Sequence, residues 1–318
     1  MNKTTTKTKK ASVKKPLIAP NTIIKLVIPK KDAESAYAKA LKKLAKKVKV
    51  DGFRKGNVPA KIAEESLNPQ SVVEEALQLI VPELYTKEVK KSGKQPLTHP
   101  EFNPISLKKG EDWVLEAHIA ERPEINLKSY KETVKKAKKQ ATKELETQIK
   151  KTTEEAKKHE KECKDDKHDH KSPKPTAEEK KNFTLQFIYR ELVEKLKIEV
   201  QELLVKEEVR FDLDNLNNQL KQMNIPFEKF LEHRKMTFEQ LSTELAAGAL
   251  SRIQMSFIIS EIANTEKMTV EKADLDAEFA KITDENTRKQ QEANPRYIDM
   301  ISQNILRQKV ADYLLALK

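Results

Sequence analysis

Apolar residues recur along this chain with two different spacings, and these spacings predict where helices and strands lie. Residues 33–48 place their apolar side chains three and four positions apart, which is typical of an amphipathic helix. Residues 23–28 are rich in Ile, Leu and Val, and residues 113–119 alternate between two faces, so both predict β-strands. The Lys108–Glu111 stretch, just before residues 113–119, predicts a hairpin turn.

Helix start signals and prolines divide the rest of the N-terminal part. A short helix is expected from Pro59 to about Leu67, and a capping box at Ser71 predicts the start of a longer helix that ends near Ser92. The prolines that follow indicate an edge strand or an irregular stretch; they are Pro96, Pro100 and Pro104. Together these elements predict a small α+β domain over residues 21–128, with helices on an antiparallel sheet.

The rest of the chain predicts a mostly α fold. Residues 182–318 keep the helical spacing and predict an all-α domain of about six helices, one of which starts at a capping box on Thr237. Residues 129–181 are charged and hold almost no large apolar side chains, so we expect a solvated helix and a flexible linker that bury no core. Residues 1–20 predict a basic disordered tail, with an organelle-targeting segment as the alternative.

Charge is distributed unevenly and indicates an anionic partner. The net charge of the 318 residues is +12, yet residues 1–60 alone hold 17 Lys or Arg against three acids, a net of +14. A basic block of this kind is typical of binding to nucleic acid or another anionic surface. The single cysteine, Cys163, fits a reducing compartment, and no apolar run reaches the roughly 18 residues of a membrane span. We therefore expect a cytoplasmic protein with no membrane partner.

The most distinctive stretch is Gly52-Phe53-Arg54-Lys55-Gly56-Asn57-Val58-Pro59, which we call the signature loop. Its glycines bracket an aromatic ring and two cations, so it predicts an exposed loop between two helices. The alternative is an ordinary helix connection with solvated charges. The helix before the loop carries lysines off its apolar stripe, and we call them the cationic face: Lys39, Lys42, Lys43, Lys46 and Lys47.

The signature loop resembles that of bacterial trigger factors, which are ribosome-associated chaperones, although Asn57 stands where the family usually has Lys. Val73-Glu74-Glu75-Ala76-Leu77 and Ala120-Glu121-Arg122-Pro123-Glu124-Ile125 are similar to later parts of the family's N-terminal domain. Residues 259–270 and 307–314 are similar, more diffusely, to its C-terminal helical domain. The resemblance covers residues 21–130 and 182–318.

The resemblance implies an ATP-independent chaperone that docks at the ribosomal exit tunnel and holds nascent unfolded polypeptides. It implies that a large-subunit protein and rRNA are contacted by Gly52, Phe53, Arg54, Lys55, Gly56 and Pro59, with the cationic face as an auxiliary surface. Clients are expected on the C-terminal helices, where Met223, Phe230, Met236 and Met255 can line an adaptable apolar surface. Each of these four is also compatible with an ordinary core position. No DNA partner and no cofactor are expected.

One part of the family pattern is missing from the sequence. Trigger factors usually carry an FKBP-like prolyl isomerase between the two similar segments, but residues 131–181 contain no Gly, Trp, Phe or Tyr and are too few and too charged for that fold. We therefore expect a chain without the isomerase domain and without enzymatic activity, and no catalytic constellation is recognisable. The alternatives are a ribosome- or rRNA-binding structural protein without holdase activity, or a residual prolyl isomerase.

A histidine- and cysteine-containing stretch lies inside this charged segment. His159, Cys163, His168 and His170 could together hold a Zn²⁺ ion, since His and Cys are its usual ligands. Their spacing matches no known zinc-finger pattern, however, and Lys and Asp surround them without an apolar shell. We therefore predict no metal here and interpret the stretch as solvated linker.

Overall fold

The computed structural model describes residues 17–49, 58–162 and 175–317. Packing divides the chain into two compact units, and neither is a continuous stretch of sequence. The first unit holds Met1–Arg122 and Val200–Met236, and the second holds Pro123–Glu199 and Thr237–Lys318. Residues 200–236, which the sequence groups with the C-terminal helices, thus pack with the N-terminal part. The domain boundaries expected after residues 20, 128 and 181 remain predictions.

A three-stranded antiparallel sheet is the centre of the first unit. Its strands are, in order across the sheet, β2 (Thr22–Ile28), β4 (Trp113–Ile119) and β3 (Glu101–Ser106). The register pairs Thr22 with Ile119 and Ile28 with Trp113, and the β3–β4 pairing shifts between Pro104 and Ser106. β3 lies at an edge of the sheet, as its proline predicts, because an edge position tolerates a residue without a backbone donor.

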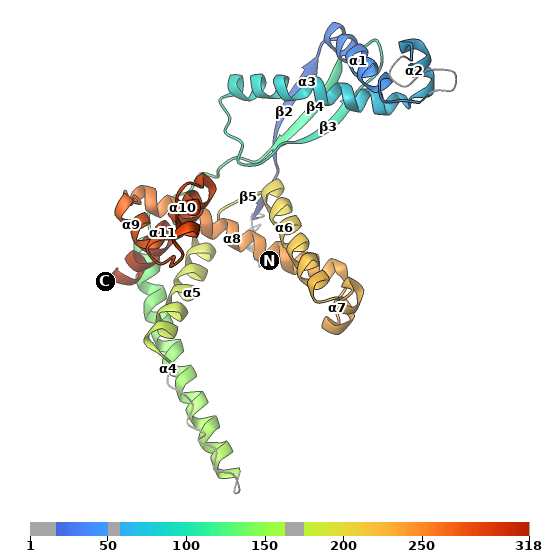
Figure 1. Cartoon of the computed structure of the whole chain (residues 1–318). Coiled ribbons are helices and arrows are strands. Elements are labelled where there is room, and N and C mark those ends of the chain that lie inside the picture. The colour runs from blue at the N-terminus through green and yellow to red at the C-terminus, as the bar shows by residue number, and fades with distance from the viewer. Residues whose placement is uncertain (1–16, 50–57, 163–174, 318) are drawn as a thin grey trace, which may run out of the picture. The chain divides into compact units, whose positions relative to one another are not determined.

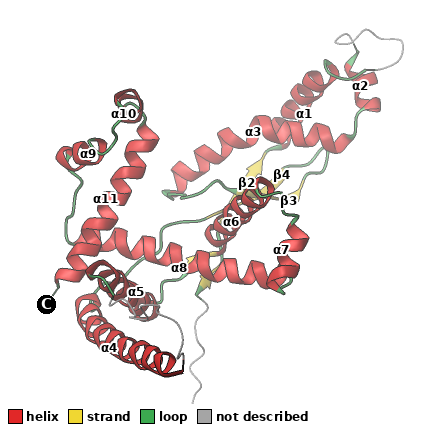
Figure 2. Ribbon diagram, turned by 60° about the horizontal axis from the view of Figure 1, so that its bottom comes forward, coloured by secondary structure: helices red, strands yellow, loops and turns green. Residues whose placement is uncertain are grey.

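Helices α1 (Lys30–Ala45) and α3 (Pro69–Ser92) cover one face of this sheet (Figure 2). The alternation along β4 explains the arrangement, because every second residue of that strand is buried against the helices. The core between sheet and helices includes Leu26, Ile28, Trp113, Leu115, Ile119, Ala36, Ala40, Val72 and Ala76. A short helix, α2 (Ala60–Ser66), lies between α1 and α3 along the chain.

Helix α3 begins two residues before the predicted capping box. Its N-cap is Asn68, whose side-chain oxygen accepts a hydrogen bond from the backbone N–H of Gln70 at 2.9 Å, and Pro69 occupies the first helical position. The capping-box prediction at Ser71 is therefore wrong, because Asn68 and Pro69 together supply an earlier start signal. Gly93 ends the helix with a left-handed φ of 67°, a conformation that glycine adopts without strain.

The first unit also contains a second helical part. Strand β1 (Ile18–Ala19) pairs in parallel with β5 (Val200–Gln201), and β5 leads directly into α6 (Glu202–Gln222). A short turn joins α6 to α7 (Phe227–Arg234) (Figure 1). We call this helix pair the α6–α7 arm.

In the described part of the second unit, every regular element is a helix, as the mostly α prediction requires. Its helices are α4 (Tyr130–Glu162), α5 (Ala177–Leu196), α8 (Phe238–Thr265), α9 (Lys272–Phe279), α10 (Glu285–Glu292) and α11 (Pro295–Ala316). The capping box predicted at Thr237 is confirmed, because Thr237 and Gln240 exchange hydrogen bonds of 2.9 and 3.2 Å. Within the described parts of the chain, no helix is both long and apolar enough to cross a membrane.

Helix α4 occupies the segment that the sequence predicts to be solvated and coreless. Its residues Val134, Ala137 and Ala141 have no exposed surface, and α4 packs along α5 (Figure 1). The expectation that this segment buries nothing is therefore wrong for its first three turns. Alanines at a helix contact allow the two axes to approach closely, so few large apolar residues are needed. Beyond these turns the charged side chains are exposed, as expected, for example at Glu146 and Lys150.

Candidate functional site

A small apolar cluster joins the end of the signature loop to the helices on either side of it. Gly52, Phe53, Arg54, Lys55, Gly56 and Asn57 lie outside the described residues, whereas Val58 and Pro59 are described. Pro59 is the N-cap of α2, and Val58 is buried with Ala45 and Ala63 from α1 and α2. Val48, Ile62 and Leu67 pack against these three residues. The described residues before and after residues 50–57 thus lead from one helix, α1, to another, α2, as the sequence predicts.

A polar contact braces α2 against the hairpin between β3 and β4. The Glu64 carboxylate on α2 accepts hydrogen bonds from Lys109 Nζ at 2.8 Å and from the Tyr37 hydroxyl of α1 at 3.3 Å. The hydrogen bond and charge of Lys109 hold the pKa of Glu64 below its ordinary value, and burial raises the pKa of Tyr37. Gly110, with φ of 86°, allows the tight turn that presents Lys109. Lys109 was missed by the sequence reasoning, because it lies 45 residues from Glu64.

The cationic face lies on the solvent side of α1 and of the two residues that follow its end. Lys39, Lys42, Lys46 and Lys47 are exposed, and the opposite side of the helix buries Ala33, Ala36, Ala40, Leu41 and Ala45. Lys43 differs from the others because it forms an ion pair with Glu75 of α3, whose side chain is only 13% exposed. Four of the five predicted lysines thus remain available to an anionic partner, while Lys43 also ties α1 to α3.

The four residues predicted to hold clients are divided between the two compact units. Met223, Phe230 and Met236 belong to the first unit with the α6–α7 arm, and Met255 on α8 belongs to the second. Met223 is 66% exposed, whereas Phe230, Met236 and Met255 are half-buried. The Phe230 ring lies 6.4 Å from that of Phe227, and the Arg234 guanidinium lies 5.8 Å above it. Only Met223 of the predicted set is thus an exposed apolar side chain.

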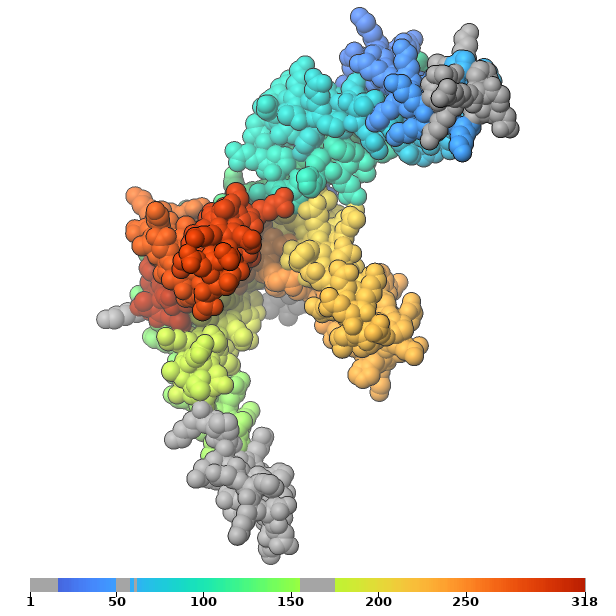
Figure 3. Space-filling model, in the orientation of Figure 1, coloured from blue at the N-terminus to red at the C-terminus, as the bar shows by residue number. Residues whose placement is uncertain are grey.

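Two exposed apolar residues of the arm were missed by the sequence reasoning. Phe211 on α6 is 61% exposed and Ile225, in the turn after α6, is 36% exposed. Phe211 falls off the apolar stripe that runs through Leu213, Leu216 and Leu220, and an aromatic residue off its helix's stripe is the signal that could have found it. The α6–α7 arm (yellow to light orange) is largely uncovered on the face that Figure 3 shows.

The predicted absence of a metal site is not decided by the geometry. Among the side chains that the structure describes, no group of three or more His, Cys, Asp or Glu residues is placed to hold a metal ion. Cys163, His168 and His170 lie outside the described residues, and the side chain of His159 is not described. The solvated-linker interpretation of this stretch therefore stays a prediction.

Two family models match this chain in succession. The model described as "Bacterial trigger factor protein (TF)" matches residues 9–156, and that described as "Bacterial trigger factor protein (TF) C-terminus" matches residues 171–316. Only residues 157–170 separate the two matches, which is far fewer than the roughly 50 residues of a small domain. No room is left between them for an isomerase domain.

Curated relatives match a shorter part of the chain. The trigger factor of Staphylococcus saprophyticus is 32% identical over 109 residues, which make up 34% of this chain and 25% of that protein. The trigger factor of Listeria welshimeri is 34% identical over 125 residues, 39% of this chain and 29% of that protein. The matched stretch thus spans little more than a quarter of these relatives' own length.

A solved structure, described as "Promiscuous Substrate Recognition in Folding and Assembly Activities of the Trigger Factor Chaperone", shares the fold. It aligns with a TM-score of 0.56 and 15% identity, over 93% of this chain and 97% of that one. The two successive family matches, this fold and the signature loop agree with one another. The chain belongs to the bacterial trigger factor family, in a form that has no isomerase domain between its two matched segments.

Proposed function

We propose that this protein is an ATP-independent chaperone that docks at the ribosomal exit tunnel and holds nascent polypeptides. It works in the cytoplasm without a cofactor, and it contacts a large-subunit protein and rRNA beside the tunnel exit. The observation that carries the proposal is the frame of the signature loop. Val58, near the end of the loop, is packed into an apolar cluster with Ala45 of α1 and Ala63 of α2, and the helix that precedes the loop presents exposed lysines.

The chemistry of the loop suits such docking. Arg54 can pair with a carboxylate or phosphate through two parallel hydrogen bonds, and Lys55 adds a point charge. Burial of the Phe53 ring contributes roughly 1.5–3 kcal/mol. In the sequence, Gly52 and Gly56 bracket these three side chains, and Pro59 follows them. Lys39, Lys42, Lys46 and Lys47 add an attraction to rRNA that weakens with salt, because it depends on the release of counterions.

The client surface is assigned to exposed apolar side chains, because an unfolded polypeptide offers apolar segments of varied shape. The related solved structure is described as recognising substrates promiscuously, and such recognition suits flexible Met and large aromatic side chains. Met223 and Phe211 on the α6–α7 arm meet this description because they are exposed. Phe230, Met236 and Met255, which the sequence also assigns to the client surface, are half-buried.

The decisive experiment is cosedimentation with idle and with translating ribosomes. Replacing Phe53, Arg54 and Lys55 together by Ala is expected to lower binding to both by at least about tenfold, because the apolar contact and both charges are lost. The variant should melt like the wild type. Lys128→Ala, which removes one exposed lysine of the second unit, is the matched control and should bind like the wild type.

The same experiment separates the alternatives. Unchanged cosedimentation of the triple variant at moderate salt would contradict docking through the loop. A wild-type protein that binds translating ribosomes no better than idle ones would favour the rRNA-binding structural protein over the holdase. A rate of proline isomerisation above background in a peptide assay would support the residual isomerase instead.

A further inference from the structure

The first residues of the α6–α7 arm are fastened to the sheet of the first unit. This fastening is not implied by the sequence, because the partners lie about 80 to 180 residues apart. β5 pairs with β1, and the backbone N–H of Val200 donates to the carbonyl oxygen of Leu17 at 2.9 Å. Three residues further on, the backbone N–H of Leu203 donates to Asn21 Oδ1 at 2.8 Å. The arm therefore begins on backbone contacts with the strand region just before β2.

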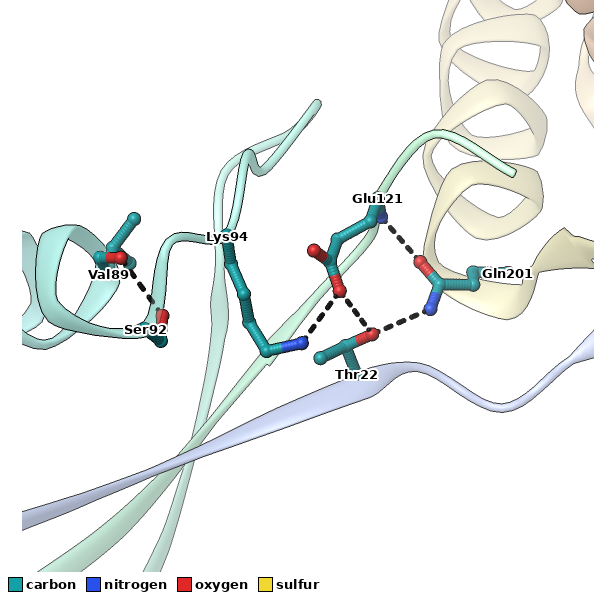
Figure 4. A network of polar contacts seen from close by, with 6 residues as sticks. All are labelled: Thr22, Val89, Ser92, Lys94, Glu121 and Gln201. Atoms are coloured by element: carbon teal, nitrogen blue, oxygen red, sulfur yellow. Dashed lines mark hydrogen bonds and ion pairs between the residues drawn. The ribbon is translucent and has the colours of Figure 1, made fainter. Parts of the chain in front are cut away.

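The side chain of Gln201 closes a polar network at this point (Figure 4). Its Nε2 donates to the Thr22 hydroxyl at 2.9 Å, and its Oε1 accepts a hydrogen bond from the backbone N–H of Glu121. Thr22 begins β2 and Glu121 follows β4, so one amide group joins the ends of two neighbouring strands to the arm. An amide side chain suits this role, because its nitrogen donates while its oxygen, a separate atom, accepts.

The rest of the network fixes the direction of these hydrogen bonds. Lys94 Nζ lies 3.0 Å from Glu121 Oε2, and the Thr22 hydroxyl donates to the same oxygen at 2.8 Å (Figure 4). These contacts lower the pKa of Glu121, so the carboxylate stays an acceptor. Because the Thr22 hydroxyl donates its hydrogen to Glu121, its oxygen can only accept a hydrogen bond, and it accepts one from Gln201 Nε2. Each polar group of the network thus has one role that its neighbours impose.

An ion pair gives the arm a further attachment, on the side of β3. Lys206 Nζ of α6 lies 2.8 and 3.0 Å from the two carboxylate oxygens of Glu101. Both side chains are substantially exposed, 61% for Lys206 and 44% for Glu101, so this pair contributes less than the Gln201 network. It is nevertheless useful as an independent probe, because its charges can be exchanged.

We infer that Gln201 is a positioning residue, which holds the α6–α7 arm on the sheet that also carries the signature loop. The inference rests on the proposed function, since it concerns how docking and client holding are linked. Two binding elements on one rigid body act with a high effective concentration, and a loose connection lowers it. A client segment that emerges near the docking site is then captured by an arm whose position on the sheet is fixed.

In a Gln201→Ala variant, two binding properties should stay unchanged while a third falls. Its binding to idle ribosomes, which uses the loop, and its binding to a free unfolded client, which uses the arm, should both equal the wild type. The additional affinity for translating over idle ribosomes should fall, by about three- to tenfold, because only the link is weakened. A general loss of stability would instead change all three readouts.

Hydrogen exchange tests the fastening itself. Exchange of the Leu203 and Val200 amides, which bond to Asn21 and Leu17, should accelerate about fivefold in Gln201→Ala, as expected for the loss of two partly buried hydrogen bonds. Gln219→Ala is the matched control, since Gln219 is an exposed glutamine of α6, the helix that Gln201 precedes. It should leave exchange and ribosome binding unchanged.

The Lys206–Glu101 pair supplies a second variant that does not depend on Gln201. Lys206→Glu alone should lower the additional affinity for translating ribosomes, and the exchange of charges in Lys206→Glu with Glu101→Lys should restore it. Unchanged hydrogen exchange at Leu203 in Gln201→Ala would show that Gln201 does not hold the arm. Accelerated exchange together with an unchanged additional affinity for translating ribosomes would show that the attachment has no role in client capture. If the wild type shows no such gain, the proposed function is contradicted, and exchange at Leu203 alone decides whether Gln201 holds the arm.

Discussion

At the start of α4, one carboxylate is held by three side chains of the second unit. The Tyr130 hydroxyl donates to Glu266 Oε1 at 2.6 Å, and Lys131 Nζ lies 2.8 Å from the same oxygen. The Tyr130 hydroxyl also lies 3.4 Å from that of Tyr313. The hydrogen bonds from Lys131 and Tyr130 lower the pKa of Glu266 to about 2, and burial raises the pKa of Tyr130. The network joins α4 to the end of α8 and to α11.

This pKa makes the stability of the protein sensitive to acid. Because the folded-state pKa of Glu266 lies below its ordinary value of 4.5, its contribution to the free energy of unfolding is present above about pH 4.5. That contribution is lost as the pH falls toward 2. In Glu266→Gln the free energy of unfolding should therefore vary less with pH between 4.5 and 2 than in the wild type, as measured by urea denaturation. Glu146→Gln, at an exposed position of α4, should keep the wild-type profile; parallel profiles for all three proteins would contradict the role of Glu266.

At the scale of elements, α1 combines two functions on two faces. Its buried face packs on the sheet and on α3, and its exposed lysines lead toward the signature loop. Lys43 belongs to both faces, since its ammonium group pairs with Glu75. The structure thus separates four lysines that are available to an anionic partner from one that also stabilises the packing of two helices.

This separation predicts how salt affects ribosome binding. Replacing Lys39, Lys42, Lys46 and Lys47 by Gln should make the plot of log affinity against log salt concentration less steep by up to about 3, if each lysine neutralises one rRNA phosphate. Lys43→Gln should leave the slope nearly unchanged, because its charge already faces Glu75. The measurement is cosedimentation across a salt series. Equal slopes for the wild type and the fourfold variant would rule out the cationic face as a phosphate contact.

Local signals in the sequence predicted most helices and strands. Features that depend on contacts between segments distant in sequence could not be predicted. The alternation in residues 113–119 and the stripe in residues 33–48 were sufficient because each follows from one buried face. The Ser71 capping box failed because Asn68 and Pro69 compete for the same helix start. Burial of Ala137 and Ala141 was not predicted, since alanine carries little hydrophobic signal. The Glu64–Lys109 and Gln201–Thr22 contacts join segments that no local pattern relates.

At the scale of the whole molecule, the first unit carries both the signature loop and the α6–α7 arm, although about 140 residues separate them in sequence. The frame of the loop depends on α1, α2 and the β3–β4 hairpin, whereas the exposed apolar side chains of the arm lie on α6 and the turn after it. The residues proposed for docking and the exposed apolar residues proposed for client holding therefore lie on separate elements of one unit, and variants at one set should spare the other.

A paired set of variants tests this division of labour. Replacing Phe211 and Met223 together by Ser removes two side chains that are 61% and 66% exposed, so the fold should be retained. Suppression of the aggregation of an unfolded client should weaken by about tenfold in the chaperone concentration required, since each apolar contact contributes roughly 1.5–3 kcal/mol before the costs of binding. Binding to idle ribosomes should stay at the wild-type level, whereas the Phe53, Arg54 and Lys55 triple variant should show the reverse pattern.

Asn217→Ser with Gln219→Ser places the same residue type at exposed polar positions of α6 and should change neither property. If this control impairs the chaperone as much as the apolar pair does, helix stability rather than apolar contact explains the loss.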